Sequence, residues 1–130
     1  MSHRSLAFLL IFLGGGFGST LRHAVNLASA ALFGITFPYG TIIVNLAGSF
    51  AMGIIAGWFA LRGHGGQMTS LFLTTGVLGG FTTFSAFSLD AALLWERGQT
   101  GGAALYVLGS VVAAIVGVFA GLAAMRTLLT

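Results

Sequence analysis

The stretch that decides the fold is Gly79-Gly80-Phe81-Thr82-Thr83-Phe84-Ser85-Ala86-Phe87-Ser88, which lies within an otherwise apolar run. It combines paired glycines, four hydroxyl side chains and spaced phenylalanines. Backbone groups inside a bilayer need partners within the protein, so an interrupted helix is tolerated there only beside protein or a polar cavity. Broken transmembrane helices commonly build ion sites from their freed backbone groups. The stretch therefore predicts a membrane helix, broken near its centre, that binds or conducts an ion.

The composition around this stretch is that of a membrane protein. The chain has 130 residues, of which 57% are hydrophobic and 5% charged, and its mean hydropathy is +1.03. A soluble domain has about 25% charged residues. At roughly 20 residues per span we expect four transmembrane helices, at about 5–33, 39–61, 68–95 and 102–128. We therefore expect an all-α membrane protein with a single transmembrane domain over residues 1–130, which leaves no room for an extramembrane catalytic domain.

The charged residues and the cysteine count exclude other classes of protein. The net charge of +3 comes from five arginines against Asp90 and Glu96, and lysine is absent. A nucleic-acid surface needs clustered basic residues, so we expect no nucleic-acid partner. The chain also has no cysteine, which excludes disulfides and thiolate metal sites. The expected surroundings are the lipid bilayer.

Glycine pairs with four-residue spacing occur in all four expected spans. This spacing puts both small residues on one helix face and lets neighbouring backbones approach closely. The pairs are Gly14 and Gly18, Gly53 and Gly57, Gly76 and Gly80, and Gly117 and Gly121. We expect dense helix–helix contact, both within one subunit and between subunits.

The arginines bear on the orientation of the chain. If both termini lie on the same side of the membrane, Arg4, Arg62 and Arg126 lie on that side. Arg97 then lies on the opposite side. Arg22 lies there too if it is close to the C-terminal end of the first span. So weak a bias allows a chain to insert in either direction. We therefore expect an antiparallel, dual-topology homodimer, although a balanced count can also arise by chance.

Asn45 lies inside the second span, with Thr41 and Ser49 four residues away on either side, so the three polar groups share one stripe. Its amide offers two N–H donors that suit an anion. An interhelical hydrogen bond that holds the helices together is the alternative.

Phe84 and Phe87 have a spacing of three residues, which places their rings on one face if the helix resumes after the break. An aromatic ring has a positive edge that can face an anion without trapping it. Ser85 and Ser88 add hydroxyl donors beside the rings. A small, hard anion needs many weak donors to replace its water, although core packing explains most phenylalanine pairs.

Gly79 and Thr82 flank the expected break, and their exposed carbonyls suit a hard monovalent cation, because calcium would demand carboxylates. A kink without an ion explains the same residues. Arg22 suits the rim of a water-filled vestibule, where it would concentrate anions, or else snorkels to the headgroups. Tyr106 and Ser110 share a face of the fourth span, where they line a path or bond to a neighbouring helix.

Asp90 supports a competing function. An intramembrane acid can couple transport to protons, as a small multidrug-type exporter requires. Its position before Glu96 and Arg97 is equally consistent with an interfacial salt bridge or a helix cap. A non-transporting packing subunit is a third interpretation, but it leaves Asn45 and the hydroxyl run unexplained.

With these motifs in order, the chain resembles the Fluc family of small fluoride channels, also called CrcB. The resemblance covers nearly the whole length. It rests on Gly14-Gly15-Gly16-Phe17-Gly18 with Arg22, Gly40-Thr41, Val44-Asn45-Leu46, Gly79 through Ser88 with Asp90, Leu94 to Gly98, and Tyr106 with Ser110. The resemblance implies a passive fluoride channel in a bacterial inner membrane that protects the cytoplasm from fluoride. It also implies a dual-topology homodimer with two pathways and a structural sodium ion at its centre.

By motif position, the resemblance also assigns roles to residues. Phe84 and Phe87 would line each pathway beside the amide of Asn45, and Arg22 would stand in the vestibule. The carbonyls of Gly79 and Thr82 would hold the sodium ion. Polar contacts from the fourth span would come from Tyr106 and Ser110.

The chain departs from the family pattern at two positions. Ala86 stands where the family usually has serine or threonine, and His23 stands where an aromatic residue is more usual. The missing hydroxyl at Ala86 puts the detail of fluoride coordination in question, whereas neither departure affects the assignment to the family.

Overall fold

The computed structural model describes residues 2–63 and 66–129, and the regular structure in this part of the chain is helical. Residues His64 and Gly65, in the segment that closes the second span, lie outside the described residues. The elements are α1 (His3–Phe33), α2 (Tyr39–Arg62), α3 (Gln67–Leu71), the π-helix η1 (Phe72–Leu78), α4 (Gly79–Phe81), α5 (Phe84–Glu96) and α6 (Thr100–Leu129). Elements α3 to α5 form one span, so the described residues contain four helical segments long and apolar enough to cross a membrane. The prediction of four spans is confirmed.

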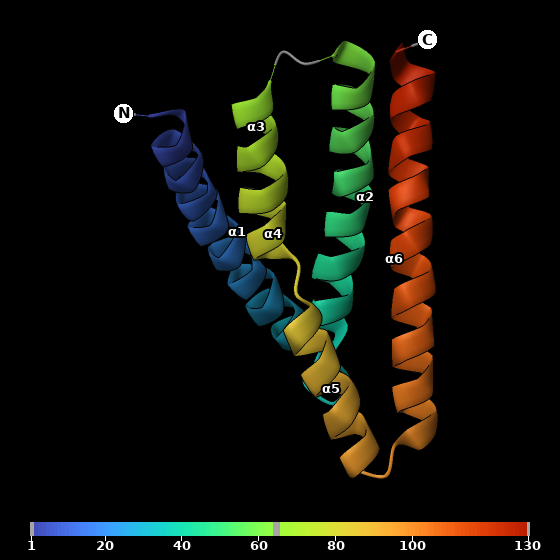
Figure 1. The fold of residues 1–130 in the computed structure, drawn as a ribbon. Helices are drawn as coiled ribbons and strands as arrows, with labels where there is room; N and C mark the ends of the chain where they lie inside the picture. The colour runs from blue at the N-terminus through green and yellow to red at the C-terminus, as the bar shows by residue number, and fades with distance from the viewer. Residues whose placement is uncertain (1, 64–65, 130) are drawn as a thin grey trace.

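The helices form two packed pairs that are joined through the third span (Figure 1). One pair is α1 with η1 and α4, and the other is α2 with α6. Below the break, α5 departs from the line of α3 and α4 and runs to the far end of the molecule, where it turns into α6 (Figure 1). The break in the third span is therefore the point at which the chain passes from one pair to the other.

The start of α1 and the end of α6 lie at the same end of the molecule as the end of α2 and the start of α3 (Figure 1). Arg4, Arg62 and Arg126 belong to this end, because they lie at the start of α1, the end of α2 and the end of α6. Arg97 follows α5 at the opposite end. The separation of the arginines is thus the one expected for termini on a shared side.

The glycine pair of α1 packs directly on the backbone of the third span. A Cβ added at Gly14 would lie 2.8 Å from the carbonyl oxygen of Phe72, and one added at Gly18 would overlap the carbonyl oxygen of Val77. Gly76 in turn lies against Gly14. The backbones of this pair of helices therefore approach closely at the glycines.

The pair α2 and α6 is built in the same way. A Cβ at Gly53 would overlap the carbonyl oxygen of Val118, and one at Gly121 would overlap the carbonyl oxygen of Phe50. The helix contact expected from the glycine spacing is therefore found within one subunit.

The π-helix η1 is a feature that the glycine and hydroxyl pattern does not predict. It occupies Phe72–Leu78, directly before the break, and the Thr74 hydroxyl donates to the carbonyl of Ser70 at 2.8 Å. Extra hydrogen bonds from threonine to the preceding turn compete with the regular helical ladder. π-helical turns are rare and occur often at functional sites. The half of the third span that precedes the break, α3 to α4, is called the upper half below. Its helix is thus irregular even before the break.

Candidate functional site

The break in the third span consists of two extended residues, Thr82 (φ −80°, ψ 159°) and Thr83 (φ −154°, ψ 117°). Thr82 ends the upper helix, because its amide and its hydroxyl both donate to the Leu78 carbonyl at 2.9 Å. Thr83 begins the lower helix as its N-cap, accepting from the amide of Ala86 at 3.2 Å. The hydroxyl run singled out in the sequence therefore caps both sides of the interruption.

Gly79 lies one turn before the break and has helical backbone angles, φ −62° and ψ −37°. In a continuous helix its carbonyl would accept from the amide of Thr83. That amide instead donates to Oδ1 of Asn45 at 2.8 Å. The Gly79 carbonyl is thus released from its helical partner, although the residue itself is helical.

Asn45 braces the break at two points. Its Nδ2 donates to the Thr83 carbonyl at 3.0 Å while its Oδ1 accepts from the Thr83 amide. A side-chain amide carries two N–H donors, so one remains after this pairing. The interhelical hydrogen bond considered for Asn45 is therefore present, and it uses only part of the amide.

A cavity of about 300 Å³ lies directly beside this brace. Its lining combines polar groups from α2, the break and α6 with aromatic and aliphatic side chains. The residues are Asn45, Gly48, Ser49, Met52, Thr82, Thr83, Phe84, Phe87, Ser110, Val111, Ala114 and Val118. Three separate spans contribute to the lining, so the cavity forms only when the whole fold is assembled.

Ser110 provides the most specific signal in this cavity. Its Oγ is buried and has no hydrogen-bond partner among the described residues. Leaving a buried hydroxyl unsatisfied costs about 1–3 kcal/mol. An orphan donor that lines a cavity is therefore available to a ligand or to water.

Phe84 and Phe87 lie on one side of α5, as their spacing predicts. Their ring centroids are 5.4 Å apart and their planes are inclined by 42°. Phe87 is buried, with 8% of its surface exposed, and its ring packs on Tyr106 with a centroid separation of 5.2 Å. Phe84 is 77% exposed. The Phe87 ring is therefore held by packing within the subunit, whereas the Phe84 ring lies on the surface of the subunit.

A second polar cluster surrounds Asp90. Oδ2 of Asp90 accepts from the Thr41 hydroxyl at 2.7 Å and from the Tyr106 hydroxyl at 3.0 Å. Tyr106 is almost fully buried, and its ring meets Phe37 edge-on at 5.8 Å. Asp90 thus bonds to hydroxyls of α2 and α6, which is neither the interfacial salt bridge nor the helix cap considered from the sequence. Thr41, Asp90 and Tyr106 were each predicted from the sequence as separate candidates. The register between the three helices brings them into one hydrogen-bonded cluster.

A cavity of about 210 Å³ adjoins this cluster. Its lining includes Thr41, Asp90 and Arg97. Asn26 and Ser29 of α1 and residues of the connection between α1 and α2 also line it. Asn26 and Ser29 were not predicted as site residues, although their polarity in the second half of an apolar helix was a signal.

The remaining predicted residues lie apart from the two cavities. Ser85 is exposed, and its Oγ is 3.3 Å from Oγ1 of Thr83. Arg22 is half-buried on α1, and neither cavity is lined by it. The structure thus brings together Asn45, Phe84, Phe87 and Ser110, with Thr82, at one cavity. It brings Thr41 to the other cavity, and it brings Tyr106 to Asp90, which lines that cavity.

The fold and the site define a small four-span membrane protein with polar cavities beside a broken helix. A family model described as "CrcB-like protein, Camphor Resistance (CrcB)" matches residues 9–122, so the chain belongs to the CrcB family.

Relatives match the chain over nearly their whole length. "Fluoride-specific ion channel FluC 2" of Nitrobacter hamburgensis is 61% identical over 121 residues, covering 93% of this chain and 98% of the relative. "Fluoride-specific ion channel FluC" of Rhodopseudomonas palustris strain BisB5 is 58% identical, covering 95% and 99%. The protein of the same name from Methylobacterium nodulans is 63% identical, covering 91% and 94%. The resemblance found in the sequence motifs is confirmed.

Proposed function

We propose that the chain forms a fluoride-selective channel through which fluoride leaves the cytoplasm passively. Its relatives are named as fluoride-specific ion channels. The observation that carries the proposal is the orphan hydroxyl of Ser110 in the cavity at the break, beside Phe84 and Phe87. A channel performs no covalent chemistry, so the chain is not an enzyme.

The path at the break uses Asn45, Phe84, Phe87 and Ser110. The remaining N–H of Asn45 and the free hydroxyl of Ser110 donate to the anion, and the positive ring edges of the two phenylalanines face it. Each of these donors is weak alone. Conduction requires that an ion bind well enough to enter and weakly enough to leave, and such a set meets this condition.

The path continues past the second cluster toward the end that carries Arg97. The hydroxyls of Thr41 and Tyr106 are hydrogen-bond donors, and a passing anion competes with Asp90 for these hydrogen bonds. Because the carboxylate repels the anion, this segment releases fluoride rather than holding it. Ser85 contributes a hydroxyl beside the break, and Arg22 raises the concentration of anions near the mouth.

The functional unit is an antiparallel homodimer with two pathways. Phe84 is 77% exposed in one subunit, and Gly79 is exposed at the centre of the same span. A second copy that packs on this face would bury both. Unlike Phe12, which is equally exposed, Phe84 also lines the polar cavity, and this supports a protein partner at this face.

A structural sodium ion at the dimer centre fits the groups available there. The Gly79 carbonyl lacks its usual helical donor, and Thr82 is extended. Two such pairs, one from each subunit, would supply carbonyl oxygens, which suit a hard cation. Both acidic residues of the chain, Asp90 and Glu96, belong to α5 below the break, so the ligands that we propose are carbonyl oxygens rather than carboxylates.

The proposed location is the inner membrane of a bacterium, which the chain spans four times. The relatives named above come from bacteria. Passive exit suffices for protection there, because hydrogen fluoride enters undissociated from acidic surroundings and releases fluoride in the cytoplasm.

Fluoride efflux from liposomes tests the proposal. Vesicles that contain the purified protein are loaded with potassium fluoride, valinomycin is added to let potassium follow, and a fluoride electrode reads the release. Rapid release without a proton gradient, and little release in a matched potassium chloride experiment, is the expected result. Correctly assembled protein that releases no fluoride would contradict the proposal.

The exporter considered from the sequence makes the opposite predictions. It would require a proton gradient and would lose activity in Asp90→Asn. The relatives' names favour the channel. A dependence of fluoride release on an imposed proton gradient would favour the exporter.

A further inference from the structure

Arg62, the last residue of α2, stacks on an aromatic ring at the end of the molecule that carries both termini. Its Cζ lies 4.2 Å from the centre of the Trp58 ring, one turn earlier on the same helix. Cation–π stacking fixes the plane of the guanidinium and leaves its in-plane N–H donors free to bind a phosphate in a bidentate manner. Tryptophan and arginine at the end of a span are typical of the membrane–water interface.

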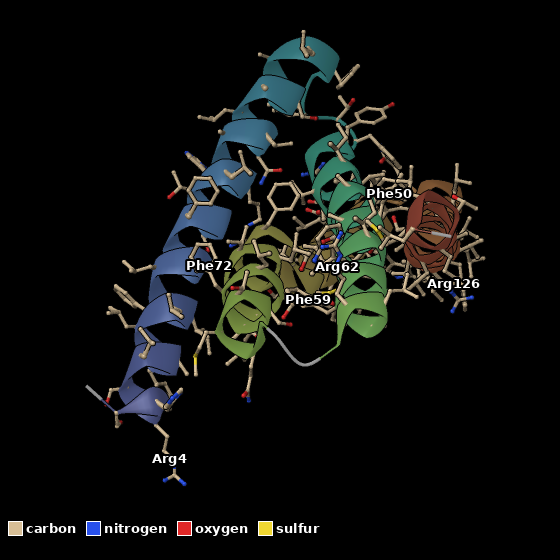
Figure 2. The ribbon with its side chains drawn as sticks, turned by 90° about the horizontal axis from the view of Figure 1, so that it is seen from above. Arg4, Phe50, Phe59, Arg62, Phe72 and Arg126 are labelled. Carbon is tan, nitrogen blue, oxygen red and sulfur yellow. The ribbon has the colours of Figure 1, made fainter. Side chains whose placement is uncertain are left out.

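A groove of about 380 Å³ begins at the same tryptophan and runs between α2, the upper third span and α6. Its lining is mostly apolar, and its large side chains are Ile54, Ile55, Trp58, Phe59, Leu73 and Met125. Among the described residues, its lining shares no member with the two polar cavities. Phe59 and Arg62 lie between α2 and the third span, whereas Arg4 and Arg126 lie at the outer sides (Figure 2).

The charged side chains at this end of the molecule are all arginines. Arg4, Arg62 and Arg126 lie here, whereas Asp90 and Glu96, the only acidic side chains of the chain, lie on α5 toward the other end. A carboxylate side chain from the same subunit therefore does not neutralise Arg62. An anion from the surroundings is the complementary partner.

We propose that the groove binds one acyl chain of an anionic phospholipid, whose phosphate Arg62 holds. The juxtaposition of a fixed phosphate-binding group with an apolar groove matches the two parts of such a lipid, and basic sites between transmembrane helices are known to bind acidic headgroups. The membrane supplies this ligand at high local concentration. The site is independent of the proposed fluoride path.

The chain contains two tryptophans, Trp58 and Trp95, and this allows a direct test. The variant Trp95→Phe leaves Trp58 as the only tryptophan, and a phospholipid with brominated acyl chains quenches its fluorescence on contact. Two vesicle preparations are compared, which contain the same fraction of brominated phosphatidylglycerol or of brominated phosphatidylcholine in both leaflets. One arginine near an anionic headgroup corresponds to about fivefold enrichment of that lipid, so we expect clearly stronger quenching by brominated phosphatidylglycerol.

Matched variants separate a specific site from general attraction to the membrane. Arg62→Gln in the Trp95→Phe background is expected to remove the difference between the two lipids, whereas Arg4→Gln, which changes the charge of the same end on α1, is expected to keep it. In the reverse variant, Trp58→Phe, the remaining Trp95 is 65% exposed at the other end, where the charge of Glu96 offsets that of Arg97, so both lipids should quench it equally.

Two outcomes would overturn the proposal. Equal quenching of Trp58 by both lipids would mean that only bulk lipid reaches the groove. Quenching of Trp58 by neither lipid would mean that a second copy of the chain covers it. Correct assembly of Trp95→Phe is checked by its elution volume in size-exclusion chromatography. If this volume differs from that of the wild type, Trp95→Tyr serves as the background instead. Because the readout is fluorescence, the result does not depend on whether the protein conducts fluoride.

Discussion

The two halves of the third span are built in different ways, although they belong to one transmembrane segment. The upper half, α3 to α4, packs on α1 through glycines whose backbones touch. The lower half, α5, packs on α2 and α6 through side chains, with Phe87 against Tyr106 and Asp90 bonded to Thr41. The upper half thus serves as a scaffold, whereas the lower half presents aromatic and hydroxyl groups. Changes in the upper half should act on assembly, and changes in the lower half should act on ion passage.

The largest effect is expected from a side chain at the backbone contact of the upper half. In Gly18→Val, the new Cβ would overlap the carbonyl oxygen of Val77, and backbone cannot move aside as a flexible side chain can. Overpacking of this kind costs about 1–3 kcal/mol or more, so we expect loss of the folded protein. The recovered yield and the thermal unfolding temperature in detergent measure the effect.

Gly16→Ala is the matched control in the same glycine run. A Cβ at Gly16 meets no atom within 4 Å, and alanine stabilises a helix interior relative to glycine by about 1 kcal/mol. Unfolding at the same or a higher temperature is therefore expected. If Gly18→Val folds as well as Gly16→Ala, then α1 is not held by backbone contact.

The second largest effect is expected where the two halves join. Asn45→Leu removes both hydrogen bonds to Thr83 and leaves the Thr83 amide without a partner. Each unsatisfied buried group costs about 1–3 kcal/mol, so the break should loosen and fluoride efflux should fall more than about tenfold. The liposome assay gives the rate, and thermal unfolding gives the change in stability.

Ser49→Ala provides the control for Asn45, because Ser49 lies one turn later on α2 and lines the same cavity. Its effect on the efflux rate should be small. Wild-type efflux in Asn45→Leu would show that the brace is not needed to shape the path.

Side-chain changes in the lower half are expected to reduce flux while the protein stays assembled. Phe84→Ile and Phe87→Ile each remove a ring edge from the cavity, and we expect each to lower fluoride efflux by at least about tenfold, or about 1.4 kcal/mol. Stability should distinguish the two, because Phe87 is 8% exposed and Phe84 is 77% exposed in the subunit. Unfolding temperature and elution volume should therefore change more for Phe87→Ile.

Phe12→Ile is the control for the surface position, since Phe12 is 76% exposed on α1. Its efflux should equal that of the wild type. Unchanged efflux in both Phe84→Ile and Phe87→Ile would remove the two rings from the proposed path.

The same contrast between the halves explains what could be predicted from the sequence. The spans, the break and the glycine contacts were predictable because they follow from local apolarity and from spacing along one helix. The Asn45 brace could not be predicted as such, because its partner is the backbone of a residue 38 positions away. The cluster at Asp90 likewise requires the register of three helices. The π-helix was missed because no residue pattern of η1 distinguishes it from a regular α-helix.

The smallest effect is expected from restoring the hydroxyl that the chain lacks at Ala86. Ala86 is half-buried in the first turn of α5, and its amide donates to Oγ1 of Thr83. A serine keeps this amide, adds one oxygen and lowers helix propensity only slightly, so Ala86→Ser should retain fluoride efflux within about twofold of the wild type. The liposome assay measures this directly, with Ala86→Val as the control for added volume without a hydroxyl. An inactive Ala86→Ser beside an active Ala86→Val would mean that the new hydroxyl competes with Ser85 and with its own amide for the Thr83 side chain. The lower half would then depend on the hydrogen bonds of its first turn as strictly as the upper half depends on its glycines.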